Sequence, residues 1–316
     1  MEEKKVPFFS VIVASYNAGD KLRRTVQSVL SQTCGDYEII VKDAGSSDGS
    51  VQELPQDARL RLIAGRDRGI YDGMNQGVAE AAGRYLLFLN CGDNLHDMQV
   101  LERVKEAAQT EERRAVAQPG GDGTRRMSEG KQYAEKAACG ERDAGVKADG
   151  RADREADAPR FVFYGDIMEE TSGQRVRANP VIDDFACYRN LPCHQACFYS
   201  RGLFAERGFD IALRVRADYE HFLWCYYRAG ARMVYLDCVV ADYEGGGFSE
   251  TAENRAVSAA EHRMVTAMYL PWGKRALFRL YMIATLQPLR EKIAHGRHTA
   301  ALYNALKARV YGRGKA

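Results

Sequence analysis

The sequence lacks a long hydrophobic run, a strong charge bias and paired cysteines. No stretch of 18 or more residues is apolar throughout, so we expect no membrane-spanning helix. A formal net charge of +2 over 316 residues gives no global bias toward nucleic acid. The eight cysteines are scattered and mostly in apolar surroundings, as free cytosolic thiols would be. Cys193, His194 and Cys197 have no second matched pair at zinc-binding spacing, so no structural zinc is expected.

The charged N-terminus and the polar residues that soon follow favour a first strand over a signal peptide, and hence a cytoplasmic location. The chain is organised around Tyr85–Leu89, an unbroken apolar run typical of a strand buried on both faces of a parallel sheet. Polar residues follow at once, and Gly92 permits a sharp turn and close approach of a ligand. Asp93 could hold Mg²⁺ or Mn²⁺ beside a diphosphate, or cap the next helix.

Other apolar runs with the same character predict strands at residues 8–14, 37–41, 60–64 and 160–166. A helix is predicted over 21–32 and another up to residue 82. The order strand, helix, strand, strand, helix, strand predicts a three-layer α/β domain. Because parallel strands end at the same edge, we expect the polar loops after them to lie together.

Four ordered motifs, at residues 10–17, 43–50, 67–75 and 89–93, resemble those of the family 2 glycosyltransferases, which have the GT-A fold. The resemblance covers about residues 8–108 and 161–250. It is closest to members that build bacterial surface polysaccharides, such as the O-antigen and colanic-acid type enzymes. It implies a mostly parallel, Rossmann-like sheet and an inverting transfer from a nucleotide-sugar donor to a saccharide acceptor, expected to be lipid-linked.

The resemblance also implies roles for individual residues. Asp43 would bind the nucleotide base, Tyr16 would pack on its plane, and Asp93 would contact metal and diphosphate. The usual Asp-x-Asp motif reads Asn90 to Asp93 here, so an amide replaces its leading carboxylate, which predicts weaker metal binding. Asn90 would touch the donor sugar or ribose. Further donor contacts are expected from Ser15, Asn17, Asp67, Arg68, Asn75 and Gly92. From the residues alone, Asp43 could equally be a turn residue, Arg68 a solvated charge and Asn75 a backbone-binding amide.

Asp218 matches the family's catalytic base, which removes the acceptor hydroxyl proton as the oxygen attacks the anomeric carbon. Its alternative role is a helix N-cap. Glu220 lies two positions on and should point elsewhere on the helix. His194 is expected to line the donor or acceptor pocket, or else to be a packing residue. Gly246 and Gly247 resemble a loop that closes over the donor diphosphate, although a flexible linker would look similar.

Residues 109–159 carry ten basic and eleven acidic side chains and no Leu, Ile, Phe or Trp. Such a segment cannot bury enough apolar surface to order itself, so we expect a disordered insertion within a glycosyltransferase domain at 1–250. A helix should follow the glycines, with a small-residue packing face formed by Ala256, Ala259, Ala260, Met264 and Ala267.

The last segment, within an extension at 251–316, is basic. Residues 270–316 hold ten lysines and arginines against Glu291 alone, interleaved with aromatic and aliphatic residues. This pattern suits peripheral binding to an anionic membrane at the inner face of the cell envelope, or a helical appendage with a solvated basic face.

The sequence leaves two other functions open. A nucleotidyltransferase would be expected to carry a glycine-rich phosphate loop right after the first strand, and residues 15–19 do not look like one. A non-catalytic binder of nucleotide sugars would be favoured if Asn90 abolished metal binding. The sequence does not identify the sugar, the base or the acceptor.

Overall fold

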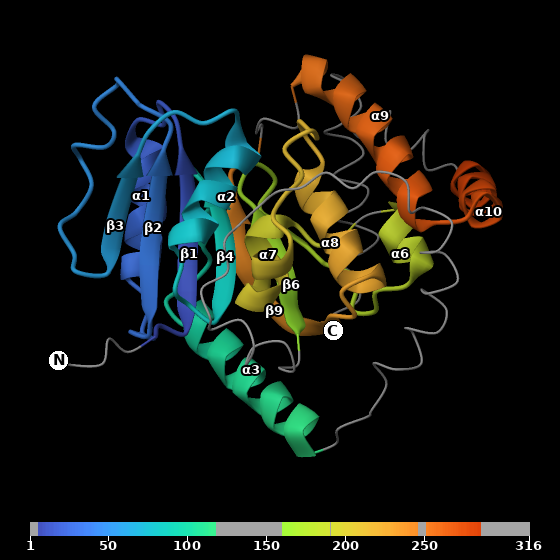
Figure 1. The fold of residues 1–316 in the computed structure, drawn as a ribbon, viewed down its shortest axis with the longest axis horizontal. Helices are drawn as coiled ribbons and strands as arrows, with labels where there is room; N and C mark the ends of the chain where they lie inside the picture. Colours follow the sequence, from blue (N-terminus) through green and yellow to red (C-terminus); the bar gives the residue numbers. More distant parts are fainter. Residues whose placement is uncertain (1–5, 118–159, 190, 246–250, 286–316) are drawn as a thin grey trace. The chain divides into compact units, whose positions relative to one another are not determined.

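A computed structural model describes residues 6–117, 160–189, 191–245 and 251–285. By compactness the chain divides into two units, Met1–Tyr269 and Leu270–Ala316. The first unit has α/β architecture and contains the expected sheet (Figure 1). The second is represented by one helix, α10 (Trp272–Ala284). Among these described residues, no helix is both long and apolar enough to cross a membrane.

In the described part of the chain, one sheet of nine strands has the order β3-β2-β1-β4-β8-β6-β9-β5, with β7 paired to β6. The strands are β1 (Phe9–Ser15), β2 (Tyr37–Asp43), β3 (Leu60–Ala64), β4 (Tyr85–Asn90), β5 (Asn94–Leu95), β6 (Phe161–Glu169), β7 (Gln174–Val176), β8 (Cys197–Ser200) and β9 (Arg232–Tyr243). The five predicted strands are confirmed to within a few residues. The central β4 is buried from Tyr85 to Leu89, as its apolar run predicted.

The strands β3, β2, β1 and β4 are parallel neighbours. Their register places Ser15 beside Asp43 and Ala14 beside Asn90. The polar residues that end these strands therefore lie along one edge of the sheet, as the sequence predicted.

The other half of the sheet is mixed. The short strand β8 runs antiparallel to both β4 and β6 and lies between them, while β9 runs parallel to β6. Because β8 follows the 3₁₀ turn η1 (His194–Ala196), this arrangement carries His194 to the sheet edge where β4 ends.

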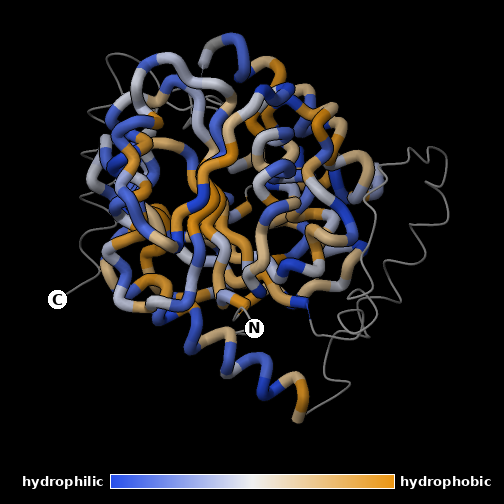
Figure 2. The backbone as a smooth tube through the Cα atoms, turned by 60° about the vertical axis from the view of Figure 1, so that its left-hand side comes forward, coloured by the Kyte–Doolittle hydropathy of each residue, from blue (hydrophilic) through white to orange (hydrophobic). Residues whose placement is uncertain are grey.

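Helices cover both faces of the sheet. They are α1 (Asp20–Leu30), α2 (Ile70–Glu80), α3 (Val100–Ala117), α6 (Asp184–Arg189), α7 (Arg201–Glu206), α8 (Ala217–Tyr227) and α9 (Ala252–Tyr269). One apolar cluster joins α1 and α3 to the face that carries Val11 and Val13; the other joins α2, α7 and α8 to the face that carries Ile12. Figure 2 shows the hydrophobic strands between more polar surface segments.

Three expectations about boundaries and packing are wrong. Helix α3 continues to Ala117, so residues 109–117 are helical and not disordered; residues 118–159 lie outside the described part. Since the first unit extends to Tyr269, α9 belongs to it and the boundary at residue 250 was placed too early. The expected small-residue face of α9 is exposed. Its buried face instead contains Asn254, Ser258, Glu261, Val265, Thr266 and Tyr269.

Candidate active site

A cavity of about 280 Å³ lies beside the carboxyl end of β4. Its lining includes Tyr71, Asn90, His194, Asp218 and Tyr243, which come from α2, β4, η1, α8 and β9 respectively. These segments are far apart in the sequence, and the sheet brings them together. Polar groups that converge in one concave site are typical of a ligand-binding or catalytic centre.

Asp218 lies in the first turn of α8, but it does not cap the helix. The cap position is Arg216, and no side chain bonds there. The carboxylate accepts hydrogen bonds from the Tyr71 hydroxyl at Oδ1 (2.9 Å) and from His194 Nδ1 at Oδ2 (3.1 Å). Burial opposes ionisation of the Asp218 carboxyl, but the hydrogen bond and charge of His194, with Tyr71, outweigh it and hold its pKa below the usual value. Asp218 is therefore ionised at neutral pH.

His194 links Asp218 to the end of β4. Its Nδ1 faces Asp218, and its Nε2 lies 3.1 Å from the amide nitrogen Nδ2 of Asn90. Burial alone would lower the pKa of His194, but the hydrogen bond and charge of Asp218, together with the charge of Asp93, raise it above the ordinary value. The protonated form of the imidazole is therefore favoured more than in a free histidine.

Asp93 sits in a tight turn that α1 holds in place. The Thr25 hydroxyl donates to the carbonyl of Asp93 (2.8 Å) and accepts from the N–H of Gly92 (3.0 Å). Gly92 has φ of 108°, a backbone conformation that residues with a Cβ rarely adopt, and a Cβ there would also crowd the Glu244 carboxylate. This confirms the sharp turn expected at Gly92.

The carboxylate of Asp93 is 3% exposed, and its Oδ2 has no hydrogen-bond partner. Burial raises the pKa of Asp93 to about 6, and nearby groups, first among them His194, offset the rise only in part. Within the described residues, no group of three or more His, Cys, Asp or Glu side chains could hold a metal by itself. A single carboxylate with a free oxygen fits Mg²⁺ or Mn²⁺ only if a diphosphate and water complete the coordination.

Asp43 ends β2 and organises the loop that follows it. Its carboxylate accepts hydrogen bonds from the backbone N–H groups of Gly45 and Ser46, and from the Ser46 hydroxyl. Burial alone would raise the pKa of Asp43, but these hydrogen bonds lower it overall. Asp43 therefore acts as a turn residue, which is one of the two roles that the sequence left open. The base-binding role stays a prediction.

The loops after β1 and β2 hold one another. The Asn17 backbone N–H donates to the Ser46 hydroxyl (2.8 Å), and the Asn17 side chain accepts from the N–H of Ser47 (2.9 Å). Asn17 itself adopts a positive φ of 47°. Tyr16 is 65% exposed beside this pair of loops, where a flat ligand could reach its ring.

Three residues with predicted donor contacts have partners within the protein, and their donor roles stay predictions. Asp67 pairs with the buried Lys42 (3.2 Å), and Arg68, with a side chain 74% exposed, pairs with Asp72. The amide of Asn75 donates to the carbonyl of Phe209 and accepts from its N–H (both 2.9 Å). Asn75 therefore anchors a backbone loop, and its amide atoms do not face the cavity. Gly246 and Gly247 lie outside the described residues.

The predicted site residues converge in part. Asn90, His194 and Asp218 line one cavity, whereas Asp43 and Asp93 do not. Both of these still belong to the same sheet edge, since Asp93 is in the turn after Asn90 and Asp43 is beside Ser15. We interpret the cavity and the adjoining loop edge as one extended site.

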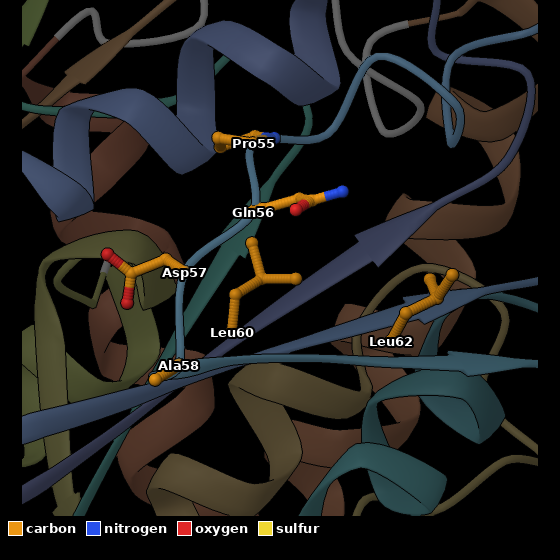
Figure 3. A pocket seen from close by; sticks show the side chains of 6 residues that line it. All are labelled: Pro55, Gln56, Asp57, Ala58, Leu60 and Leu62. Carbon is orange, nitrogen blue, oxygen red and sulfur yellow. The ribbon is translucent and has the colours of Figure 1, made fainter.

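A larger hollow, of about 510 Å³, lies elsewhere, by β3 and the chain that precedes it (Figure 3). Its lining is Pro55, Gln56, Asp57, Ala58, Leu60 and Leu62. The one charged side chain of this lining, Asp57, is already paired with Arg59. This hollow offers no converging reactive groups, so size alone does not make it the candidate site.

Sequence reasoning missed two supports of the site. Tyr71, within a quoted motif but given no role, places its hydroxyl 2.7 Å from the Val215 carbonyl and beside Asp218. Glu261 of α9 accepts hydrogen bonds from three consecutive backbone N–H groups, at residues 214–216, just before α8. The partners in each of these contacts are far apart in the sequence, so the sequence gives no signal that they meet.

Comparison with known proteins identifies the family to which this chain is similar. The model of "Glycosyl transferase family 2" matches residues 10–144. A PGL/p-HBAD biosynthesis glycosyltransferase of Mycobacterium bovis is 31% identical over 252 residues, covering 78% of this chain and 80% of the relative. An uncharacterized glycosyltransferase of Mycobacterium tuberculosis is 28% identical over 288 residues, covering 87% and 90%.

Two solved structures share the fold. The mannosyltransferase PcManGT from Pyrobaculum calidifontis, in complex with GDP-Man and Mn²⁺, has a TM-score of 0.51 at 15% identity, covering 97% of this chain and 81% of that one. Residues 1–349 of S. aureus TarS, in complex with UDP, give 0.50 at 15% identity, covering 92% and 72%. These likenesses concern the fold.

Proposed function

Since the chain belongs to glycosyltransferase family 2, we propose that it transfers a sugar from a nucleotide-sugar donor to a hydroxyl of a saccharide acceptor, with inversion at the anomeric carbon. The observation that carries this proposal is the ionised Asp218, hydrogen-bonded to His194 in the cavity at the end of β4. In open α/β sheets, ligands bind at the carboxyl ends of the strands. The carboxylate is therefore in the place where a transfer reaction needs a base.

In the proposed reaction, the acceptor oxygen forms a bond to the anomeric carbon as the bond from that carbon to the diphosphate breaks. The bonding electrons leave with the nucleoside diphosphate, and the acceptor hydroxyl loses its proton. Proton removal depends on Asp218, whose charge is held by Tyr71 and His194. The loops after β1, β2 and β4 would hold the donor, with Asn90 toward its sugar or ribose.

Asp93 would hold Mg²⁺ or Mn²⁺ together with the donor diphosphate, since its Oδ2 is buried without a partner. A divalent cation there would neutralise negative charge on the leaving group. The buried carboxylate is otherwise unfavourable, because it is held ionised in an apolar environment near neutral pH.

Calorimetric titration with UDP, GDP and dTDP, each with and without Mn²⁺, tests the donor class. We expect one nucleotide to bind more tightly than the others, and Mn²⁺ to strengthen its binding. Turnover of the matching sugar nucleotides then separates an enzyme from a non-catalytic binder. Absence of binding to all three nucleotides would contradict the proposal.

Replacing Asp93 by asparagine should make the unliganded protein more stable near neutral pH, by roughly 1–3 kcal/mol. The raised pKa of about 6 means that the folded protein binds the Asp93 proton more tightly than the unfolded chain does. The stabilisation from protonated Asp93 is complete below about pH 4 and is lost as the pH rises through about 6. The variant should thus match the wild type in denaturant titrations at acidic pH and exceed it above pH 6.

The same Asp93→Asn variant should lose the effect of Mn²⁺ on nucleotide binding. A gain in stability with a loss of ligand binding is the pattern of a residue kept for function. Equal stability of the two proteins at pH 7, or an unchanged Mn²⁺ effect, would contradict this role for Asp93.

We further propose that the acceptor is lipid-linked and serves surface polysaccharide synthesis at the inner face of the membrane. The support is the basic C-terminal segment. Helix α10 has no buried residue, and it carries Lys274, Arg275 and Arg279 along with exposed Trp272, Leu277, Leu280, Tyr281 and Ile283. Basic and aromatic side chains on one helix suit an anionic lipid surface.

Removal of residues 270–316 is expected to release the protein from liposomes that contain anionic lipid, as measured by flotation. The first compact unit ends at Tyr269, so this truncation removes one complete unit. Neutral liposomes serve as the control, because both proteins should bind them weakly. Flotation of the truncated protein with anionic liposomes at the wild-type level would refute the membrane proposal.

A further inference from the structure

We propose that the Tyr71 hydroxyl changes its hydrogen-bond partner during the transfer reaction. It donates to Asp218 while the carboxylate is ionised, and it donates to the Val215 carbonyl once Asp218 has taken the proton of the acceptor hydroxyl. The proposal rests on the proposed function, in which Asp218 is the base. It makes Tyr71 a positioning residue that stabilises the base both before and after proton transfer.

The hydroxyl of Tyr71 has one hydrogen and two acceptors. Its oxygen lies 2.7 Å from the carbonyl oxygen of Val215 and 2.9 Å from Oδ1 of Asp218. A phenol carries a single O–H, so it makes a full hydrogen bond to only one of these oxygens at a time. Burial and the Asp218 charge raise the pKa of Tyr71 well above its usual value, so the phenol keeps this hydrogen throughout the reaction.

The Val215 carbonyl is held in place by helix α9. The peptide unit of this carbonyl continues into the N–H of Arg216, which donates to Oε2 of Glu261 at 2.9 Å. The same Glu261 carboxylate accepts from the N–H groups of Arg214 and Val215, at 2.7 and 3.0 Å. Since these bonds fix the peptide, the carbonyl stays beside Tyr71 whichever acceptor the hydroxyl uses.

The charge of Asp218 determines which acceptor receives the hydrogen. An ionised acceptor forms a stronger hydrogen bond than a neutral one, so Tyr71 donates to the carboxylate before the reaction. When Oδ1 gains a proton, Asp218 becomes a donor that needs an acceptor of its own in this buried site. Tyr71 can provide that acceptor, because its hydrogen turns to Val215 and leaves a lone pair of the phenol oxygen facing Oδ1.

The second carboxylate oxygen has a partner that need not change. His194 Nδ1 donates to Oδ2 of Asp218 at 3.1 Å. The carbonyl oxygen of a protonated carboxyl group is still an acceptor, so this bond survives if the proton is on Oδ1. Tyr71, which can donate and accept, lies at Oδ1. The contacts of Asp218 therefore favour Oδ1 as the atom that takes the proton.

The proposed step balances. The acceptor O–H bond breaks and its proton bonds to Oδ1 of Asp218, while the acceptor oxygen bonds to the anomeric carbon. The electron pair of the broken C–O bond leaves with the nucleoside diphosphate. After the products leave, Asp218 releases the proton to solvent, and the Tyr71 hydroxyl turns back to the carboxylate.

Tyr164 provides a matched control. Its hydroxyl also lies between two acceptors, the carbonyl oxygens of Asn179 and Pro180, at 2.9 and 3.1 Å. Both tyrosines are buried, but Tyr164 does not line the cavity. A Tyr164→Phe variant therefore removes an equivalent hydroxyl without touching the base.

The experiment compares the two phenylalanine variants by release of nucleoside diphosphate from UDP-GlcNAc, GDP-mannose and dTDP-glucose, with water as acceptor. We expect Tyr71→Phe to bind nucleotide normally and to lose about 10–100-fold in turnover at neutral pH, because the incoming proton has no partner. A tyrosine that only donated to ionised Asp218 would give the opposite result, since its removal makes Asp218 a stronger base. Tyr164→Phe should keep wild-type turnover.

Fluorinated tyrosine at position 71 distinguishes this role from simple packing. Fluorine next to the hydroxyl makes the phenol a stronger donor and a weaker acceptor with little change in size, so it favours ionised over protonated Asp218. We expect turnover to fall from tyrosine to its monofluorinated form and again to its difluorinated form.

Two results would overturn the proposal. One is turnover by Tyr71→Phe at or above the wild-type rate, and the other is equal turnover by the proteins with tyrosine and fluorinated tyrosine. Absence of turnover of all three sugar nucleotides by the wild type would instead reject the proposed function itself.

Discussion

Replacement of Asp218 by asparagine is expected to lower sugar transfer by about 10²–10⁴-fold while nucleotide binding is retained. Asparagine keeps the shape of the side chain but removes its negative charge. In the wild type, the carboxylate accepts hydrogen bonds from the Tyr71 hydroxyl and from His194, whose Nδ1 lies 3.1 Å from Oδ2. Without that charge, the side chain can no longer serve as the base that takes the proton of the acceptor hydroxyl. Donor turnover and calorimetry on the same preparation separate the two effects.

Asp242→Asn is the matched control for this variant. The side chains of Asp218 and Asp242 are equally exposed, at 24%, and each is paired with a histidine. We expect transfer by Asp242→Asn to stay near the wild-type rate. Equal transfer by Asp218→Asn and the wild type would remove Asp218 from the mechanism.

The largest effect on stability is expected from Arg207→Ala, at about 3–5 kcal/mol in the free energy of unfolding. Arg207 donates two hydrogen bonds, of 2.9 and 2.8 Å, to the carboxylate of Glu220, which is 2% exposed. The Tyr269 hydroxyl donates to the same carboxylate. Without the guanidinium, Glu220 would be left as a buried charge whose remaining partner is neutral.

The double variant Arg207→Met with Glu220→Leu should recover most of that loss, because replacing both partners leaves no unpaired charge. Arg114→Ala, which breaks an exposed pair with Glu111, should cost under about 1 kcal/mol. Urea denaturation of the three variants measures these differences. A loss below 1 kcal/mol for Arg207→Ala would show that the buried pair contributes no more than a surface pair.

Much of the sheet from β1 to β4 could be predicted because its signals are local. Continuous apolar runs identified the parallel strands, since a strand covered on both faces has no polar side. The polar residues after them marked the sheet edge along which these strands end. Asp218 was singled out by its motif and lines the cavity, while its catalytic role stays a prediction. Glu220 points elsewhere as predicted, toward Arg207.

The remainder depends on contacts between distant residues. Nothing near His194 in the sequence indicates that β8 enters the sheet antiparallel between β4 and β6 and thereby places the ring beside Asp218. On α9, alanines suggested the buried face, but Glu261 is buried there because it binds the backbone before α8. Hydrophobicity read along one helix cannot reveal such a polar anchor.

A crystal structure of the Asp218→Asn protein with the donor that calorimetry identifies would test the proposed site most directly. We expect the diphosphate beside the Gly92–Asp93 turn and the anomeric carbon in the cavity at the end of β4. A donor bound instead in the hollow at residues 55–62, with the cavity unaltered, would contradict it.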